Sequence, residues 1–110
     1  MRKFIPTSGW NYGEQQVKEK GTDRTYTLTQ PKKLFSEDYY TVRRCIAVEN
    51  VDMYTIPEKD FYVYEFSFMT TGSSLRMVAI DEETALDLVH AHLEEFMQGK
   101  ANSVLNMYFG

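Results

Sequence analysis

Two histidines and a pair of glutamates are the residues of this chain whose types could bind a metal ion. His90 and His92 stand two positions apart, with Glu94 and Glu95 close behind. Residues two apart on a helix point about 200° away from one another, whereas the histidines of a helical zinc site are four positions apart. The spacing therefore predicts packing and solvated roles for both histidines, and no metal site.

The single cysteine is the strongest nucleophile in the sequence. No local signature places a base beside Cys45, and the sequence contains neither a glycine-rich phosphate loop nor a paired-cysteine metal motif. A lone cysteine within an apolar strand is typically a small buried hydrophobic residue. We therefore expect a protein that is not an enzyme and that holds no cofactor.

Two pairs of basic residues are candidates for binding the phosphates of a nucleic acid. Lys32 and Lys33 form one pair, and Arg43 and Arg44 form the other. They could act together only if the fold gathers them around an exposed aromatic surface. The whole chain has a net charge of −4, which disfavours binding to a phosphate backbone. Nucleic-acid binding is therefore an alternative hypothesis.

An aromatic surface is available on one predicted strand. Alternation places four rings on one face of residues 61–69, namely Tyr62, Tyr64, Phe66 and Phe68. Large exposed apolar patches are uncommon on monomeric proteins, so an aromatic face is usually a core face. We expect the main helix to cover these rings.

Charge is divided unevenly along the chain. Residues 1–48 contain nine lysines and arginines against five acidic residues, and residues 49–110 contain three against eleven. Such a division can steer a charged partner or favour head-to-tail self-association. It bears on encounter with a partner and does not indicate a reaction.

Aromatic residues outside the regular pattern are the candidates for contact with another protein. They are Trp10, Tyr12, Tyr54, Tyr108 and Phe109. Because aromatic anchors dominate many interfaces, we expect a non-catalytic protein that acts by protein–protein interaction. A regulator, adaptor or inhibitor of the kind that phages and mobile elements encode would fit. The second alternative is a homo-oligomeric structural protein whose tail and edge strand pair between subunits.

A small sheet and one amphipathic helix must position these residues. The helix is predicted at residues 81–98, with Asp81 as its N-cap and Gly99 as its end. Strands are predicted at residues 25–30, 39–48, 61–69 and 75–80, with Pro31 ending the first and residues 70–74 forming a hairpin loop.

This order predicts a single α+β domain over residues 1–110. Its mostly antiparallel sheet would have about four to five strands, and one main C-terminal helix would pack on one face. Residues 1–21 are expected to be loop-rich or mobile, and residues 101–110 to dock as a tail. The unpaired thiol and the lack of a long apolar window predict a cytoplasmic protein with no membrane association.

Overall fold

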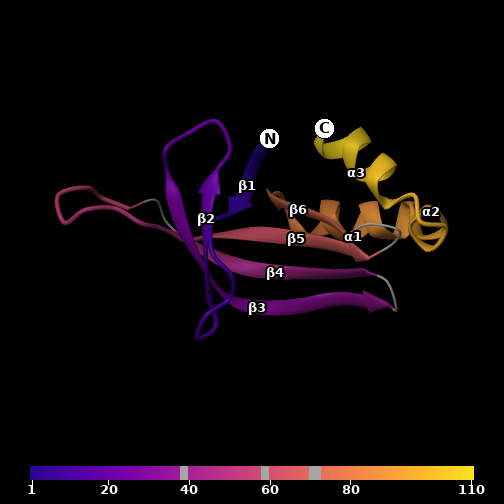
Figure 1. Cartoon of the computed structure of the whole chain (residues 1–110), viewed down its shortest axis with the longest axis horizontal. Helices are drawn as coiled ribbons and strands as arrows, with labels where there is room; N and C mark the ends of the chain where they lie inside the picture. The colour runs from indigo at the N-terminus through magenta and orange to yellow at the C-terminus, as the bar shows by residue number, and fades with distance from the viewer. Residues whose placement is uncertain (38–39, 58–59, 70–72) are drawn as a thin grey trace.

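The chain forms a closed barrel of six antiparallel strands, followed by three short helices (Figure 1). The computed structural model describes residues 1–37, 40–57, 60–69 and 73–110. Within these ranges the elements are β1 (Arg2–Pro6), β2 (Glu14–Glu19), β3 (Thr25–Glu37), β4 (Tyr40–Glu49), β5 (Phe61–Met69), β6 (Ser73–Ala79), α1 (Glu82–Ala91), α2 (Leu93–Met97) and α3 (Ala101–Phe109).

The prediction of an open sheet with about four to five strands is wrong, because the six strands close into a barrel. Each strand pairs with the next, and β1 also pairs with β6. The two strands that sequence reasoning missed are β1 and β2, which lie in the first 21 residues. Pairing between β1 and β6 spans only Arg2–Phe4 and Met77–Ala79, so the earlier part of β6 runs past β1.

Strand β3 is longer than the sequence predicted. It continues through Pro31 to Glu37, and its register with β4 shifts between Thr29 and Lys32. Gln30 adopts a left-handed backbone with φ of 51° at this irregularity. A proline lacks the N–H that a regular ladder needs, and the bulge is a place where that loss is tolerated. Pro31 therefore interrupts the pairing without ending the strand.

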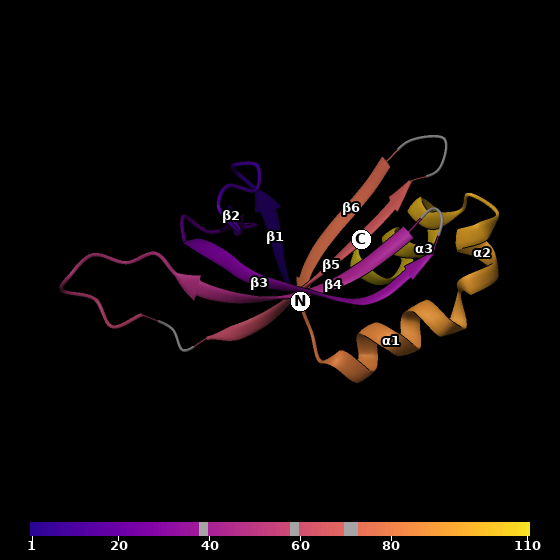
Figure 2. The ribbon, with the colours of Figure 1, turned by 90° about the horizontal axis from the view of Figure 1, so that it is seen from below.

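The molecule has two hydrophobic cores on opposite faces of the strands. One fills the barrel and contains Phe4, Val17, Tyr26, Leu28, Cys45, Ala47, Val63 and Met77. The other lies between the sheet and the helices and contains Tyr40, Val42, Tyr64, Phe66, Val78, Ala85, Leu88, Val89, Phe96, Ala101, Val104, Leu105 and Phe109. Figure 2 shows the three helices gathered on one side of β4, β5 and β6.

The aromatic face of β5 is largely a core face, as its sequence indicates. Tyr64 and Phe66 are buried in the core beneath the helices. Tyr62 remains about half exposed, and the side chain of Phe68 lies outside the described part of the structure. The prediction that a helix covers the rings is thus confirmed for the two central ones.

The predicted helix over residues 81–98 is two helices. α1 ends at Ala91 and α2 begins at Leu93, because His92 leaves the helical conformation with φ of −123° and ψ of 23°. The predicted cap is confirmed, since the Asp81 carboxylate accepts a hydrogen bond from the Thr84 N–H at 2.8 Å. Gly99 follows α2 with φ of 79°, as expected of a helix-ending glycine.

Parts of two predictions fall outside the described residues. These are Tyr39, the first residue of the predicted strand 39–48, and residues 70–72 of the predicted hairpin loop. Across the described ranges, no helix combines the length and the apolar composition needed to cross a membrane.

Candidate functional site

The chain between β4 and β5 projects from the body as an arm, which we define as residues 50–57 (Figures 1 and 2). Three large apolar side chains lie on it, and Met53, Tyr54 and Ile56 are 84%, 90% and 91% exposed. The Asp52 carboxylate accepts hydrogen bonds from the Tyr54 N–H at 2.9 Å and the Thr55 hydroxyl at 3.0 Å. The arm is therefore a shaped turn that presents apolar groups to solvent.

The remaining predicted protein contacts are scattered. Tyr12 is fully exposed in the turn between β1 and β2, and Tyr108 is about half exposed on α3. Trp10 is partly buried against the barrel core. Phe109 was named as a candidate contact but is not exposed, because its ring is buried against Phe66 with ring centres 5.5 Å apart. The fold does not gather these residues into one surface.

The two histidines have packing roles. His92 Nε2 lies 2.8 Å from the Tyr108 hydroxyl, and His92 Nδ1 lies 3.7 Å from the Glu95 carboxylate. The His90 ring meets the edge of the Phe35 ring. No group of three or more metal-ligating side chains occurs within the described ranges of the chain.

The four basic candidates for nucleic-acid contact are neighbours in the sheet, but the two cross-strand pairs lie on opposite faces of it. Lys32 pairs with Arg44, and Lys33 pairs with Arg43, across β3 and β4. Each arginine is also held by an acidic residue. Arg44 lies 3.1 Å from the carboxylate of Glu82 on α1, and its charge lies over the Tyr62 ring. The charges of the two arginines are therefore compensated, whereas the side chains of Lys32 and Lys33 are exposed.

Two buried glutamates inside the barrel are paired with arginines. Arg43 Nε donates to Glu65 at 2.9 Å, and Arg43 also lies over the Trp10 ring. Glu65 is only 4% exposed, and the arginine supplies the partner that a buried carboxylate needs. Trp10 therefore packs over an ion pair of the barrel.

The second pair stands beside β1. Arg2 Nη2 donates to the Glu19 carboxylate at 2.8 Å, and the Tyr26 hydroxyl donates to the same oxygen at 3.0 Å. The hydrogen bond from Arg2 is the main reason that the pKa of Glu19 is lowered, and the one from Tyr26 adds to it. The Arg2 guanidinium also lies over the Phe61 ring, 4.4 Å from its centre. The Glu19 carboxylate is thus hydrogen-bonded within the barrel, whereas the buried Oε1 of Gln15 has no hydrogen-bond partner among the described residues.

Cys45 is a buried residue, as the sequence predicts. Burial raises the pKa of its thiol to about 11, with a further contribution from the charge of Glu65. A thiol of this kind stays protonated at neutral pH. The residue packs as part of the barrel core and is poorly suited to act as a nucleophile.

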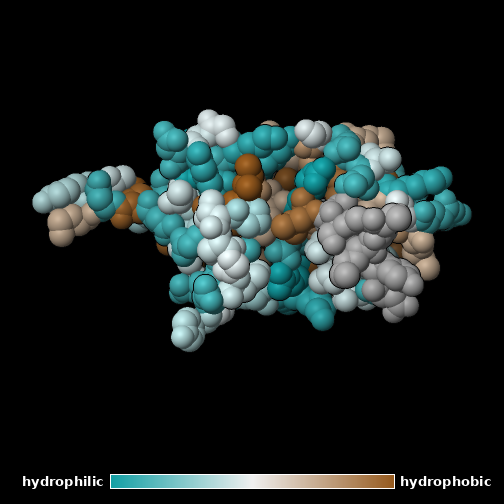
Figure 3. Space-filling model, viewed as in Figure 1, coloured by the Kyte–Doolittle hydropathy of each residue, from teal (hydrophilic) through white to brown (hydrophobic). Residues whose placement is uncertain are grey.

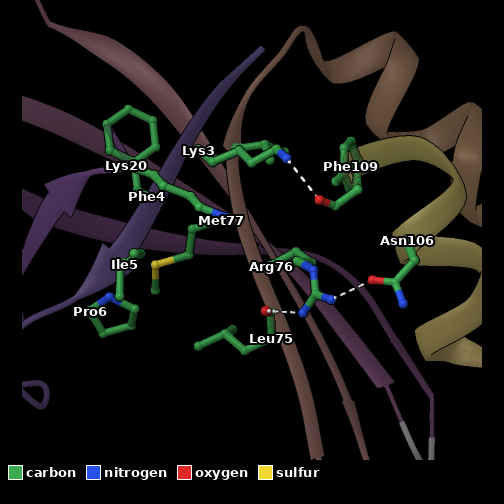
Figure 4. Close-up of a pocket in the computed structure, with 12 residues that line it drawn as sticks. Lys3, Phe4, Ile5, Pro6, Lys20, Leu75, Arg76, Met77, Asn106 and Phe109 are labelled. Carbon is green, nitrogen blue, oxygen red and sulfur yellow. Dashed lines mark hydrogen bonds between the residues drawn. The ribbon is translucent and has the colours of Figure 1, made fainter. Parts of the chain in front are cut away.

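A cleft opens where β1 and β6 separate and α3 ends. We call it the cationic cleft; its volume is about 310 Å³, and it is lined by Lys3, Phe4, Ile5, Pro6, Lys20, Leu75, Arg76, Met77, Val78, Asn106, Phe109 and Gly110. Three basic side chains turn toward this space, and no acidic side chain lines it (Figure 4). Sequence reasoning could not find it, since Lys3, Lys20 and Arg76 are far apart in the chain.

Hydrogen bonds hold two of these cations in place. Arg76 Nη1 donates to the Leu75 carbonyl at 3.0 Å, and Arg76 Nη2 donates to Asn106 Oδ1 at 2.8 Å. Lys3 Nζ donates to the backbone oxygen of Gly110 at 3.3 Å. Lys20 contributes its backbone N–H to the Lys3 carbonyl, while its side chain is exposed. The cleft is therefore a positively charged site with partly fixed donors.

Comparison with known proteins yields no relative: no family model matches this chain, no curated protein matches its sequence, and no solved structure matches its fold.

Proposed function

We propose that this protein is a non-catalytic module that binds another protein through its arm. The observation that carries the proposal is the exposure of three large apolar side chains on one projecting turn, Met53, Tyr54 and Ile56. Exposing them to water is unfavourable, and burial in a partner would recover roughly 1.5–3 kcal/mol for each fully buried side chain. A regulator, adaptor or inhibitor would use such a segment as its contact.

The arm has the chemistry of an interface anchor. It carries one aromatic ring and two flexible or branched aliphatic side chains, whose large contact areas are typical of interface centres. Asp52 shapes the turn by accepting two local hydrogen bonds, which lowers the entropy lost when the arm is fixed in a complex. The partner surface that fits is a shallow apolar groove.

The test compares capture by matched variants of the full chain. The triple variant Met53→Ser, Tyr54→Ser, Ile56→Ser removes the anchor, and Tyr12→Ser removes an equally exposed aromatic residue on a different turn. We expect both variants to melt at the wild-type temperature, because the replaced side chains are exposed. Proteins recovered by the wild type and by Tyr12→Ser should be absent from the triple variant, as measured by quantitative mass spectrometry. Identical recovery by all three proteins would contradict the proposal.

Light scattering on the same three proteins separates the homo-oligomer from a different partner. If the wild type self-associates and the triple variant is monomeric, the arm binds a second copy of the chain. A monomeric wild type directs the search to other proteins.

A further inference from the structure

We propose that the cationic cleft binds a small organic phosphate, that is, a phosphate group carried on a compact apolar group. The site is separate from the arm, which joins β4 to β5, whereas the cleft lies between β1, β6 and α3 (Figures 1 and 4). The proposal therefore goes beyond protein binding and does not depend on it.

Three basic side chains line the cleft without an acidic side chain among them, unlike the arginines that are paired in the barrel. Arg2, Arg43 and Arg44 each lie within 3.1 Å of a glutamate carboxylate. Within the described ranges, by contrast, the side chains of Lys3, Lys20 and Arg76 form no ion pair with an acidic side chain. What sets the cleft apart is that three basic side chains line one hollow whose described lining residues include no acidic side chain, although the chain carries a net charge of −4. An anion supplied from outside would complete the site.

Phosphate fits these donors better than a carboxylate does. A phosphate monoester carries a charge of about −1.5 to −2 at neutral pH and three acceptor oxygens. Arg76 is oriented by Leu75 and Asn106, which use one N–H of each terminal nitrogen, and the remaining N–H groups of its planar guanidinium suit phosphate oxygens. Lys3 and Lys20 add two ammonium groups, each with several donors. Three cationic side chains from two strands and a turn can therefore surround one dianion.

The walls of the cleft indicate a small ligand with an apolar part. Ile5 is 49% exposed and Leu75 is 39% exposed, and Met77, a buried residue of the barrel core, also lines the cleft. Figure 3 shows apolar atoms over β1 and β6 within a hydrophilic surface. The volume of about 310 Å³ is at the lower end of ligand pockets, which suits one small molecule. A nucleic acid is disfavoured because its backbone needs an extended track of cations.

Titrations followed by ¹H–¹⁵N NMR would test the site directly. The probes are phenyl phosphate, inorganic phosphate and benzoate, each added at constant ionic strength. We expect saturable shifts at the cleft residues, with phenyl phosphate binding tightest because its ring covers Ile5 and Leu75. Benzoate should bind several-fold more weakly because it carries a single charge. Equal affinity for phenyl phosphate and benzoate, or shifts that never saturate, would overturn the proposal.

Three variants assign the binding to the cleft. Arg76→Gln should weaken phenyl phosphate binding roughly tenfold, the scale of a charge-assisted hydrogen bond. Lys20→Gln should weaken it several-fold and leave the fold intact, because that side chain is exposed. Lys32→Gln is the matched control, an exposed lysine on β3 that does not line the cleft, and it should leave the affinity unchanged. If Lys32→Gln weakens binding as much as Lys20→Gln, the effect is general electrostatics and the assigned site is wrong.

Discussion

At the scale of single residues, this protein places charged groups inside a barrel and neutralises them there. Glu19 is the clearest example, because Arg2 and Tyr26 both donate to one of its carboxylate oxygens. These donors favour the ionised carboxylate, so the pKa of Glu19 in the folded protein is below its ordinary value of 4.5. The folded state therefore binds this proton less readily than the unfolded chain does.

The lowered pKa of Glu19 predicts a specific loss of stability in acid. The contribution of this carboxylate is fully present above its ordinary pKa of 4.5, and it is lost as the pH falls through the lower folded value. Glu19→Gln removes the titrating group, so it should melt well below the wild type at neutral pH. The difference in melting temperature between the two proteins should become smaller as the pH falls from about 6 to about 3, measured by circular dichroism. A difference in melting temperature that stays constant across that range would contradict the role assigned to Arg2 and Glu19.

At the scale of elements, helix α3 is held by one apolar side. Leu105 is fully buried in the core between sheet and helices, whereas Met107, two positions later, is 66% exposed. Leu105→Ala should lower the free energy of unfolding by about 2–5 kcal/mol, because the substitution leaves a cavity in a packed core. Met107→Ala should change it by less than about 0.5 kcal/mol, as is usual at the surface. Urea denaturation measures both, and equal effects would mean that α3 does not dock through this side.

The elements with regular periodicity were predictable from sequence. The strands β4, β5 and β6 alternate apolar residues, and α1 has a capping aspartate and an apolar stripe, so their positions follow from local pattern. Strands β1 and β2 were missed because interior positions are polar. Gln15 and Glu19 point into the barrel from β2, and the Arg2 side chain joins them from β1. The hydrogen bond between Arg2 and Glu19 is made across strands, which a single-strand pattern does not contain.

Within the two sites, residues in conspicuous local patterns were predictable, and residues gathered by tertiary structure were not. Tyr54 could be named as a contact because an aromatic residue in a polar loop is conspicuous, but its neighbours Met53 and Ile56 were not among the named contacts. All three side chains are exposed on the projecting arm. The cationic cleft depends on closure of the barrel, since β1 and β6 meet only when the sheet closes. A prediction without closure could not bring Lys3 beside Arg76.

At the scale of the whole molecule, the basic and acidic halves of the sequence do not form separate basic and acidic regions in the fold. Arg43 and Arg44 belong to the basic half, and their partners Glu65 and Glu82 belong to the acidic half. Folding therefore pairs residues across the division, and the cationic cleft gathers three basic side chains in one hollow with no acidic side chain among its described lining residues. This arrangement makes the anion site a product of tertiary structure.

The two cores lead to a prediction about how the molecule opens. The barrel core closes through a short seam, where Phe4 pairs with Met77 and its ring lies 5.4 Å from that of Tyr26. Cys45 lies in that core, so its labelling reports opening of the barrel. Phe4→Ala should accelerate labelling of Cys45 by a thiol reagent by more than its loss of global stability explains, because the seam opens locally.

Leu105→Ala is the comparison, since Leu105 belongs to the other core and its loss loosens the helices. In this variant the labelling rate of Cys45 should rise only by the factor that the loss of global stability predicts. Urea denaturation in the same buffer measures that loss. Reagent concentration must be low enough that reclosing is faster than labelling, so that the rate reports the open population. If the Cys45 labelling rates of both variants follow the population of globally unfolded protein, the barrel and the helical layer open as one cooperative unit. The seam then has no independent motion. If Phe4→Ala labels faster than that population predicts, the weak point of the fold is the β1–β6 seam, the same place at which the cationic cleft opens.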